Sequence, residues 1–489
     1  MFICNFRSFS RSVFTLLLAV GLTAAHAHSG KARFHAVIDT DGAADDLRTL
    51  CLLLGNREVE VLAVTTSEGA LLPDSAAVRV RALLNSFYHE GIPVGAGRAV
   101  EAPVPAWRAH SERVAWGDAA SCEFPAAKSL LAQTLADEEE RVVVIALGAL
   151  TNLSDLLHER PDLGSRIERI VWYNDRAEPL SGANYAVDRA AAQHVLASGV
   201  PVTVVTADPS CPFVVTPALL DALAAVPTPY ARKIVATHRA APLAELVAAG
   251  HLRVWDDLTA VWLFAPELFS VRRLSATVDV CALADESGVQ GAQEQLKAIL
   301  RGKPDSESRV FYGFPVDGGL YAADVAPLVD SAIVRHGPSE WRAAVLTNEL
   351  HGHLGIYATI GVKMGIRARE YFNIGVDDIR VVTFAGHRPP VSCMNDGLQV
   401  GTGASVGHGL IDVAQVDAPR PEARFTFKNK TIRLALKPAY AERIRREVQR
   451  GVARYGDLTE PYWQYVRALA LRYWLDFDRH EIFELTVEE

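Results

Sequence analysis

Short apolar runs alternate with amphipathic stretches from Phe34 to about residue 280. The runs HAVID, VEVLAVTT, RVVVIALG and VPVTVVTAD are nearly continuous in Val, Ile and Leu, whereas AAVRVRALLNSF and DRAAAQHVLASG show helical spacing. Continuous apolar runs are typical of parallel strands, because helices cover both faces of a parallel sheet. The pattern therefore predicts an α/β domain with a mostly parallel sheet.

The pattern changes in the last third of the chain. A polar stretch at 284–310 interrupts it, VFYGFPVDGG has the pattern of one last strand, and Gly337 with Pro338 marks a break before a helix. Farther on, the two alternating runs of RFTFKNKTIRLAL flank a polar turn and predict a β-hairpin. We expect a first domain over 34–330 and a smaller α+β domain over 338–489.

Composition and charge narrow the class of protein. With 49% hydrophobic and 22% charged residues, the 489-residue chain has the composition of a folded globular protein. Its formal net charge is −9, and it contains no run rich in Lys or Arg that could neutralise phosphates. Nucleic acid is therefore not an expected partner.

The N-terminus carries the one long apolar run of the sequence. Arg7 and Arg11 precede VFTLLLAVGLTAA, and a small-x-small tripeptide ends at Ala27. This run is shorter than the roughly 20 residues that span a bilayer, and the layout is typical of a secretory signal peptide. We expect residues 1–27 to be removed, the mature protein to be periplasmic or secreted from a bacterium, and no stable membrane insertion. Cys4 would leave with the signal, so an odd number of cysteines would remain.

An acidic cluster follows the first predicted strand. DTDGAADD contains four carboxylates, those of Asp39, Asp41, Asp45 and Asp46. Ligands of open α/β sheets bind at the carboxyl ends of the strands. Charges this close favour a bound divalent cation, and hard oxygen ligands favour calcium or magnesium. For one or two of these aspartates, a helix N-terminus or a turn would be explanation enough.

DTDGAADD resembles the DTDPGxDD signature of the inosine-uridine-preferring nucleoside hydrolases, metal-dependent enzymes that cleave N-ribosidic bonds. Three further segments agree in order. ALGALTNL at 146–153 is similar to the family's LGPLTN, NYAVDRAAAQHVLASG at 184–199 to FN…DPEAA…SG, and VWDDLTAVWLFAPELF at 254–269 to HDPLA…L…PELF. The resemblance covers about 34–330 and implies a nucleoside hydrolase-like fold for this part of the chain.

The resemblance also implies a calcium site. Asp41 would bind calcium and act as general base, Asp46 and Asp256 would complete the carboxylate ligands, and Thr151 would offer its backbone carbonyl. A bound cation acidifies and positions a water, and a carboxylate takes the proton of that water. The predicted chemistry is therefore hydrolysis of an N-ribosidic bond.

The remaining implied contacts are to the substrate. Asp45 would hold the ribose hydroxyls, and Asn184 would contact the sugar. Asp39 would support the general base, Asp41. Many family members have a histidine before the last ligand, whereas this chain has Trp255. A tryptophan cannot protonate a leaving base but can stack on one, and core or interface packing is an equally open reading for it.

The chain departs from the family at positions that contact substrate. The family's Gly-Asn after the second strand reads Gly69-Ala70, and the glutamate before the family's Phe-Asn reads Gly182. Compensating contacts could come from Glu68, Asn174 or Glu178. The departures leave open a modified or larger ribosyl compound as substrate.

A second constellation lies in the last third of the chain. His351 and His353 belong to HGHLGIYATIGVKMG, and Cys393 begins CMNDGLQVGTGASVGHG. These segments resemble the HGHxCPG and C-x-x-DAIQ-x-x-TG-x-T-x-G motifs of the E-type subunit family of formylmethanofuran dehydrogenase, over about 345–440 and on to the C-terminus. The resemblance implies zinc or another transition metal held by these three residues, although the family's first cysteine is replaced near Gly355.

Three functions remain open at this point. We expect an exported, calcium-dependent N-ribosyl hydrolase of a small ribosyl compound. The alternatives are a ribosyl-ligand binding protein that has lost catalysis, and a periplasmic transition-metal protein that acts through its C-terminal domain. The sequence leaves a homo-oligomer open as well.

Overall fold

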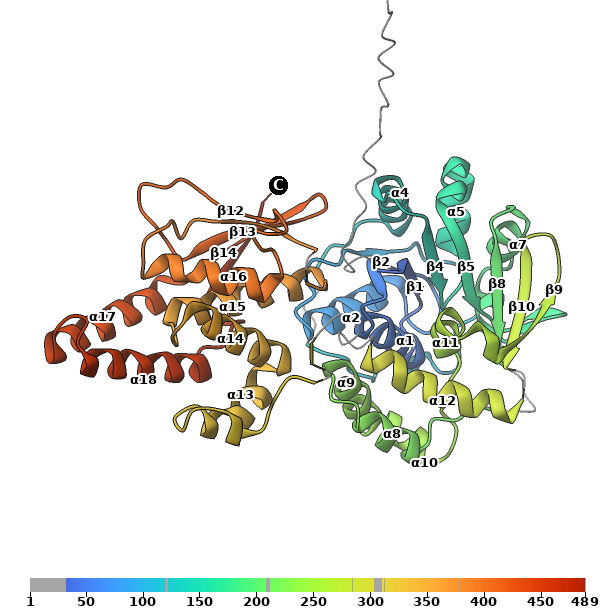
Figure 1. The fold of residues 1–489 in the computed structure, drawn as a ribbon. Coiled ribbons are helices and arrows are strands. Elements are labelled where there is room, and N and C mark those ends of the chain that lie inside the picture. Colours follow the sequence, from blue (N-terminus) through green and yellow to red (C-terminus); the bar gives the residue numbers. More distant parts are fainter. Residues whose placement is uncertain are drawn as a thin grey trace, which may run out of the picture.

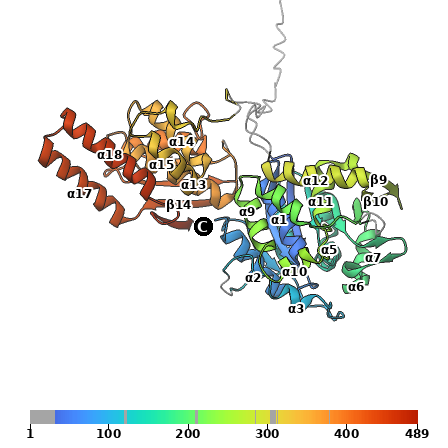
Figure 2. The same ribbon diagram turned by 90° about the horizontal axis from the view of Figure 1, so that it is seen from below.

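The computed structural model describes residues 32–118, 122–207, 212–283, 285–302, 310–311, 313–376 and 378–488. The expected signal at 1–27 lies outside the described residues. Two domains lie side by side in both views (Figure 1, Figure 2). No helix in the described part is long and apolar enough to cross a membrane. The cysteines Cys51, Cys122, Cys281 and Cys393 are free thiols.

An eight-stranded sheet forms the centre of the first domain. Its order is β3-β2-β1-β4-β5-β8-β10-β9, and every neighbouring pair is parallel except β10 with β9. The strands are β1 (Phe34–Thr40), β2 (Val59–Thr66), β3 (Val94–Ala96), β4 (Val142–Ala146), β5 (Ile167–Tyr173), β8 (Val202–Thr206), β9 (Phe269–Arg273) and β10 (Val278–Leu283). The predicted parallel α/β domain is confirmed.

Helices cover both faces of this sheet. They are α1 (Ala44–Gly55), α2 (Pro73–Asn85), α3 (Arg108–Ser111), α4 (Ala127–Asp137), α5 (Thr151–Glu159), α6 (Ala183–Val187), α7 (Arg189–Ala197), α8 (Pro217–Ala224), α9 (Pro229–His238), α10 (Leu243–Ala248), α11 (Asp257–Phe264) and α12 (Glu286–Arg301). Ala36 and Ile38 of β1 enter one apolar cluster, whereas Val37 between them enters another. Alternate side chains of a strand point to opposite faces, so burial on both sides requires the continuous apolar runs seen in the sequence.

A five-stranded mixed sheet and six helices form the described part of the second domain. The sheet order is β12-β11-β13-β14-β15, with β11 (Arg380–Thr383), β12 (Ile411–Val413), β13 (Glu422–Phe427), β14 (Lys430–Leu436) and β15 (Phe483–Glu488). The helices are α13 (Val329–His336), α14 (Pro338–His351), α15 (Ile356–Phe372), α16 (Met394–Thr402), α17 (Pro438–Tyr455) and α18 (Glu460–Asp476). Antiparallel β13 and β14 confirm the predicted hairpin.

The second domain begins earlier than the sequence suggests. The predicted strand at VFYGFPVDGG is wrong, because the described residues of this segment form no strand. Phe314 and Tyr321 instead pack against the core of the second domain, to which Val325 belongs. The Tyr321 ring also meets the Trp341 ring edge to face at 5.2 Å. These apolar side chains attach the segment to the second core and not to the edge of the first sheet.

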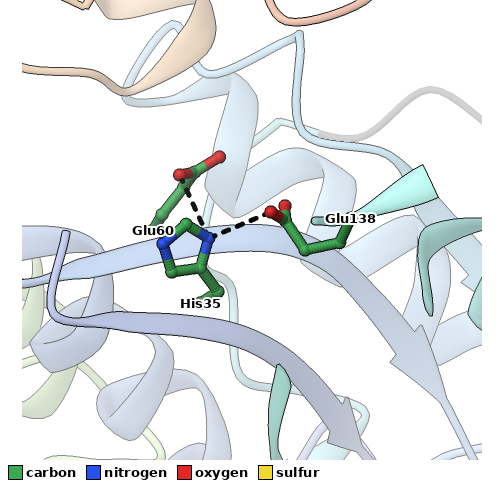
Figure 3. Close-up of side chains that lie close together, drawn as sticks. All are labelled: His35, Glu60 and Glu138. Carbon is green, nitrogen blue, oxygen red and sulfur yellow. Dashed lines mark ion pairs between the residues drawn. The ribbon is translucent and has the colours of Figure 1, made fainter. Parts of the chain in front are cut away.

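The second domain contacts the edge of the first sheet at which the strands begin. Lys428, in the turn between β13 and β14, places its ammonium 2.6 Å from Glu60 and 2.6 Å from Glu138. His35 Nδ1 lies 3.6 Å from Glu60 and 3.4 Å from Glu138 (Figure 3). Burial opposes the charge of Glu138, but hydrogen bonds to His35 and Lys428 lower its pKa to about 2. The His35, Glu60 and Glu138 group has the donors of a metal site, yet the Lys428 ammonium already pairs with both of its carboxylates.

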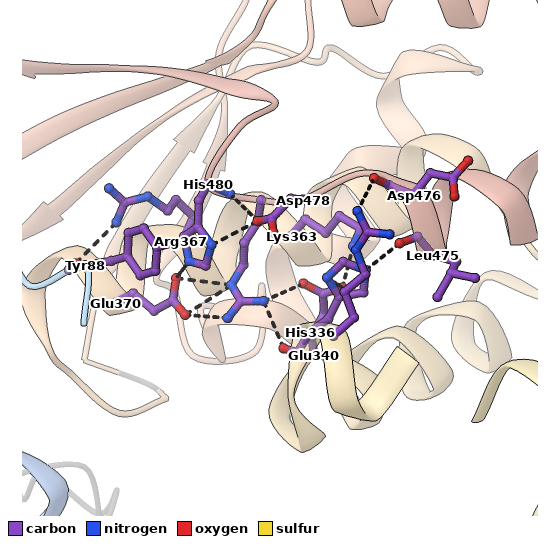
Figure 4. A network of polar contacts seen from close by, with 12 residues as sticks. Tyr88, His336, Glu340, Lys363, Arg367, Glu370, Leu475, Asp476, Asp478 and His480 are labelled. Carbon is purple, nitrogen blue, oxygen red and sulfur yellow. Dashed lines mark hydrogen bonds and ion pairs between the residues drawn. The ribbon is translucent and has the colours of Figure 1, made fainter. Parts of the chain in front are cut away.

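A second contact between the domains is centred on Tyr88. Its ring stacks on His480 with centroids 3.4 Å apart and planes at 4°, and Arg367 donates to the Tyr88 carbonyl at 3.3 Å. The network continues into the second domain through Glu370, which accepts from His480 and Arg479 (Figure 4). Polar contacts thus join the two domains at the end of the sheet where the strands begin, opposite their carboxyl ends.

Candidate active site

The acidic segments meet at the carboxyl ends of β1 and its neighbours. Gly42 has a φ of +80°, which turns the chain sharply from β1 into α1. Asp45 and Asp46 then lie in the first turn of α1, and Asp256 precedes α11. Carboxylate oxygens of Asp45, Asp46 and Asp256 all lie within 4.8 Å of one another. Two helix N-termini therefore bring together carboxylates from segments more than 200 residues apart.

Asp41 lies beside this group. Its backbone N–H donates to Asp46 Oδ2 at 2.9 Å, and its own carboxylate accepts from the N–H groups of Ala43 at 3.1 Å and Ala70 at 3.0 Å. The closely spaced group thus contains Asp45, which the resemblance placed on the ribose hydroxyls, and the predicted ligand Asp41 lies next to Asp46. Backbone N–H groups orient the Asp41 carboxylate there, and its role as a calcium ligand stays a prediction.

The donor set fits a hard divalent cation. Asp46 Oδ1 and Asp256 Oδ1 are buried and have no hydrogen-bond partner. Burial, and then the neighbouring carboxylates, raise the pKa values of Asp46 and Asp256 well above the ordinary range. Carboxylates in this position need a positive charge between them to remain ionised, and calcium accepts oxygen ligands in flexible numbers.

Asp39 and Thr151 come from two neighbouring strand ends, Asp39 from β1 and Thr151 from the start of α5 after β4. Asp39 is fully buried and accepts from Thr65 Oγ1 at 2.6 Å and Asn152 Nδ2 at 2.8 Å, while burial raises its pKa to about 6. Thr151 is the first residue of α5, after β4, which pairs with β1. Its hydroxyl donates to Asp188 at 3.0 Å, so the side chain is engaged with Asp188. The predicted calcium ligand is the backbone carbonyl of Thr151, not this hydroxyl.

A pocket of about 180 Å³ opens beside Asp41. Its lining includes Asp41, Gly69, Asn184 and Trp107, with further residues of the 103–105 and 183–187 segments. The Asn184 amide donates to the carbonyls of Leu147 at 2.8 Å and Tyr173 at 3.1 Å. Both amide hydrogens are therefore used, and Oδ1 is the atom left to accept from a ligand.

Two exposed tryptophans belong to the neighbourhood of the site: Trp107 lines the pocket, whereas Trp255 precedes Asp256 and is not among the lining residues. Trp255 is 41% exposed and Trp107 is 48% exposed, so the core-packing alternative for Trp255 is wrong. Trp107 was not predicted as a site residue, because the segment around it has no periodicity. Its one signal is an aromatic residue close behind Pro103 and Pro105 in a non-periodic stretch.

The three suggested compensating residues are engaged in other contacts. Glu68 is buried and accepts from Arg108 at 2.6 Å, and the Asn174 amide donates to the Arg176 and Ser181 carbonyls at 2.8 and 2.9 Å. Glu178 pairs with Arg272 on the surface. None of the three is among the residues that line the pocket.

The residues of the second predicted metal site do not converge as the carboxylates of the first domain do. His351 and His353 have ring centroids 4.3 Å apart, and His351 Nδ1 lies 2.7 Å from Asp396 Oδ2. Within the described residues, His351, His353 and Cys393 do not form a group of ligand atoms within 4.8 Å of one another. Gly355 lies against the imidazole, since a Cβ there would be 3.0 Å from His351 Nε2. The family's cysteine is missing at the place where it would reach His351.

Comparison with known proteins identifies both domains. The family model for inosine-uridine preferring nucleoside hydrolase matches residues 36–307, and the model "FmdE, Molybdenum formylmethanofuran dehydrogenase operon" matches residues 350–484. A pyrimidine-specific ribonucleoside hydrolase of Shewanella baltica is 30% identical over 261 residues, which cover 49% of this chain and 80% of that protein. One from Klebsiella pneumoniae is 29% identical over 258 residues, covering 48% and 80%.

Solved structures of the same kind also align. A purine-preferring ribonucleoside hydrolase from Gardnerella vaginalis aligns with a TM-score of 0.46 and 16% identity, over 55% of this chain and 99% of that one. A plant nucleoside hydrolase aligns with a TM-score of 0.46 and 19% identity, over 54% and 99%. The first family model alone matches more than half of the 489 residues. The chain belongs to the inosine-uridine preferring nucleoside hydrolase family, a family of N-glycosyl hydrolases, and carries an FmdE domain behind its hydrolase domain.

Proposed function

We propose that the protein is a calcium-dependent hydrolase of the N-ribosidic bond in a nucleoside or a related small ribosyl compound. One observation carries the proposal: the carboxylates of Asp45, Asp46 and Asp256 converge, and buried oxygens of the last two have no partner. Relatives named ribonucleoside hydrolases support a nucleoside as the substrate. The apolar run before Ala27 supports export, which N-terminal sequencing of the mature protein would test.

The residues around the pocket have different roles in the proposed hydrolysis. Asp41, Asp46 and Asp256, with the Thr151 carbonyl, would hold the calcium, whose chemistry is to acidify and position a water. Asp41 lines the pocket with its carboxylate held by two backbone N–H groups, an arrangement suited to accepting the proton of that water. Asp45 and Asn184 Oδ1 would accept from ribose hydroxyls. Trp107, which lines the pocket, and Trp255, which precedes Asp256, are exposed side chains on which a planar base could stack.

Ribose release from a panel of purine and pyrimidine nucleosides tests the proposal. We expect Asp41→Asn to lower kcat/KM by about 100-fold or more, because a positioned base contributes on that scale. Chelation should abolish activity and added calcium should restore it. Asp162→Asn, which changes an exposed carboxylate paired with Arg160, is the control. Equal ribose release by wild type and Asp41→Asn would show that the catalytic assignment is wrong.

The FmdE domain supplies a second candidate function, transition-metal binding. Asp396 holds His351 Nδ1, and His351 Nε2 is buried without a hydrogen-bond partner. A carboxylate on one imidazole nitrogen is typical of a histidine that binds metal through the other. Metal analysis of the same preparations separates the two candidates. Calcium alone supports the hydrolase, whereas stoichiometric zinc that is lost in His351→Ala supports a metal-binding second domain.

A further inference from the structure

A buried ion pair lies directly behind the candidate calcium site. Arg48 follows Asp46 by two residues on α1, and Asp257 follows Asp256 at the start of α11. Arg48 Nε donates to Asp257 Oδ1 at 2.7 Å, and the same guanidinium donates to Asp257 Oδ2 at 2.5 Å. The side chains are only 4% and 0% exposed. The pair therefore joins the two helices that carry the converging carboxylates.

Further contacts complete the coordination of the guanidinium. Arg48 also donates to the Arg253 carbonyl at 3.0 Å and lies 2.8 Å from His238 Nε2. His238 Nδ1 lies 2.8 Å from the Ile234 carbonyl, which assigns the proton to Nδ1 and leaves Nε2 as an acceptor. Burial and the charge of Arg48 lower the pKa of His238 to about 3, so this ring stays neutral. The arginine thus has a single well-defined position.

We propose that Arg48 and Asp257 form a clamp that positions the calcium-binding carboxylates of α1 and α11. The inference rests on the proposed function and names two positioning residues for that site. Arg48 lies three residues after Asp45, on the same side of α1. A planar guanidinium held by both oxygens of a carboxylate fixes distance and orientation together. The clamp therefore sets how the first turn of α1 faces the N-terminus of α11.

Stability alone does not account for this pair. Moving two charges out of water costs about as much as their attraction returns, so a packed apolar pair of similar size is often equally stable. The charge of Arg48 also acts on the cluster, because it opposes the rise in the pKa of Asp45 that burial causes. Asp257 stands where the HDPLA motif of the family has proline, which has no side-chain acceptor. The clamp is thus a feature of this chain's own sequence.

An apolar replacement of the pair separates positioning from stability. The double variant Arg48→Met/Asp257→Leu should remain folded, and the single variants Arg48→Met and Asp257→Asn should each leave a partner unpaired. We expect calcium affinity, measured by titration calorimetry on the full-length protein, to fall roughly 10- to 100-fold in the double variant, the scale seen for groups that orient metal ligands. Arg160→Met, at an exposed ion pair, should bind calcium as the wild type does.

The possible outcomes distinguish the clamp from the function on which it rests. Lower calcium affinity in a double variant that melts near the wild-type temperature supports the clamp. Wild-type affinity in that variant overturns it while leaving the hydrolase proposal intact. If the double variant does not fold, calcium affinity of Arg48→Lys decides in its place, and an unchanged value overturns the clamp. A wild-type protein that binds no calcium overturns both.

Discussion

Gly69 shows how closely the backbone approaches Asp41. A Cβ built at Gly69 would lie 2.1 Å from Asp41 Oδ2 and 2.6 Å from Asp41 Cβ. The next residue, Ala70, lacks the side chain that the family uses at this position, yet its N–H donates to Asp41. The turn after β2 therefore orients the candidate base through its backbone, and only glycine fits at position 69.

Gly69→Ala should misplace Asp41 without removing it. Because a shift of about 1 Å in a catalytic group costs on the order of 100-fold in rate, we expect kcat/KM for nucleoside hydrolysis to fall between about 10- and 100-fold. Gly313→Ala is the matched control, since nothing lies within 4 Å of a Cβ at that position. Unchanged kinetics in Gly69→Ala would show that the turn after β2 moves to make room for the methyl group and does not orient Asp41.

At the scale of elements, the segment that carries Trp107 is tied to the turn after β2. Arg108 donates to Glu68 Oε1 at 2.6 Å and to the Gly69 carbonyl at 2.7 Å. Residues 97–107 form no helix or strand, so few backbone contacts hold them over the pocket. The side chain of Arg108 is thus the main polar contact that holds the 97–107 segment beside Asp41.

Arg108→Met should loosen this segment more than it disturbs the chemistry. Hydrogen bonds to a charged group contribute about 1.5–3 kcal/mol, so we expect KM to rise about 10-fold with a smaller change in kcat. Arg113→Met changes a neighbouring exposed arginine and serves as the control. A fall in kcat with KM constant would contradict a role in holding the substrate pocket.

At the scale of the whole molecule, the two domains meet at the edge of the sheet opposite the acidic cluster. Lys428, Glu60 and Glu138 lie where β2 and β4 begin, whereas Asp41 and Asp46 lie where β1 has ended. The FmdE domain therefore does not cover the pocket beside Asp41 through this contact. Its effect on the hydrolase domain is expected in stability and not in catalysis.

Lys428→Met should leave Glu60 and Glu138 close together without their cation. The lysine side chain is 38% exposed, so solvent screens part of the loss, and we expect the free energy of unfolding to fall by about 1–2 kcal/mol. Calcium-dependent activity should stay at the wild-type level. Lys128→Met, at an exposed surface pair, should change neither quantity. Unfolding identical to wild type would show that the contact does not hold the domains together.

Features that depend on local sequence were predicted correctly, whereas a feature that depends on contacts between distant segments was not. Runs such as VVVIA predicted strands correctly, because alternate side chains of a doubly covered strand must all be apolar. The predicted strand after residue 310 was wrong, because Phe314 and Tyr321 found partners in the second core and not along a sheet edge. Apolar patterning predicts burial, but not against which element a side chain is buried.

The sequence by itself determined the fold class, the family of each domain and the acidic segments that carry the candidate chemistry, because these depend on local patterns and ordered motifs. Only the tertiary structure decided that Asp45 joins Asp46 and Asp256, and that Arg48 pairs with Asp257, 209 residues away. Those contacts depend on how α1 and α11 pack against each other. No periodicity within either helix specifies the distance and angle between them.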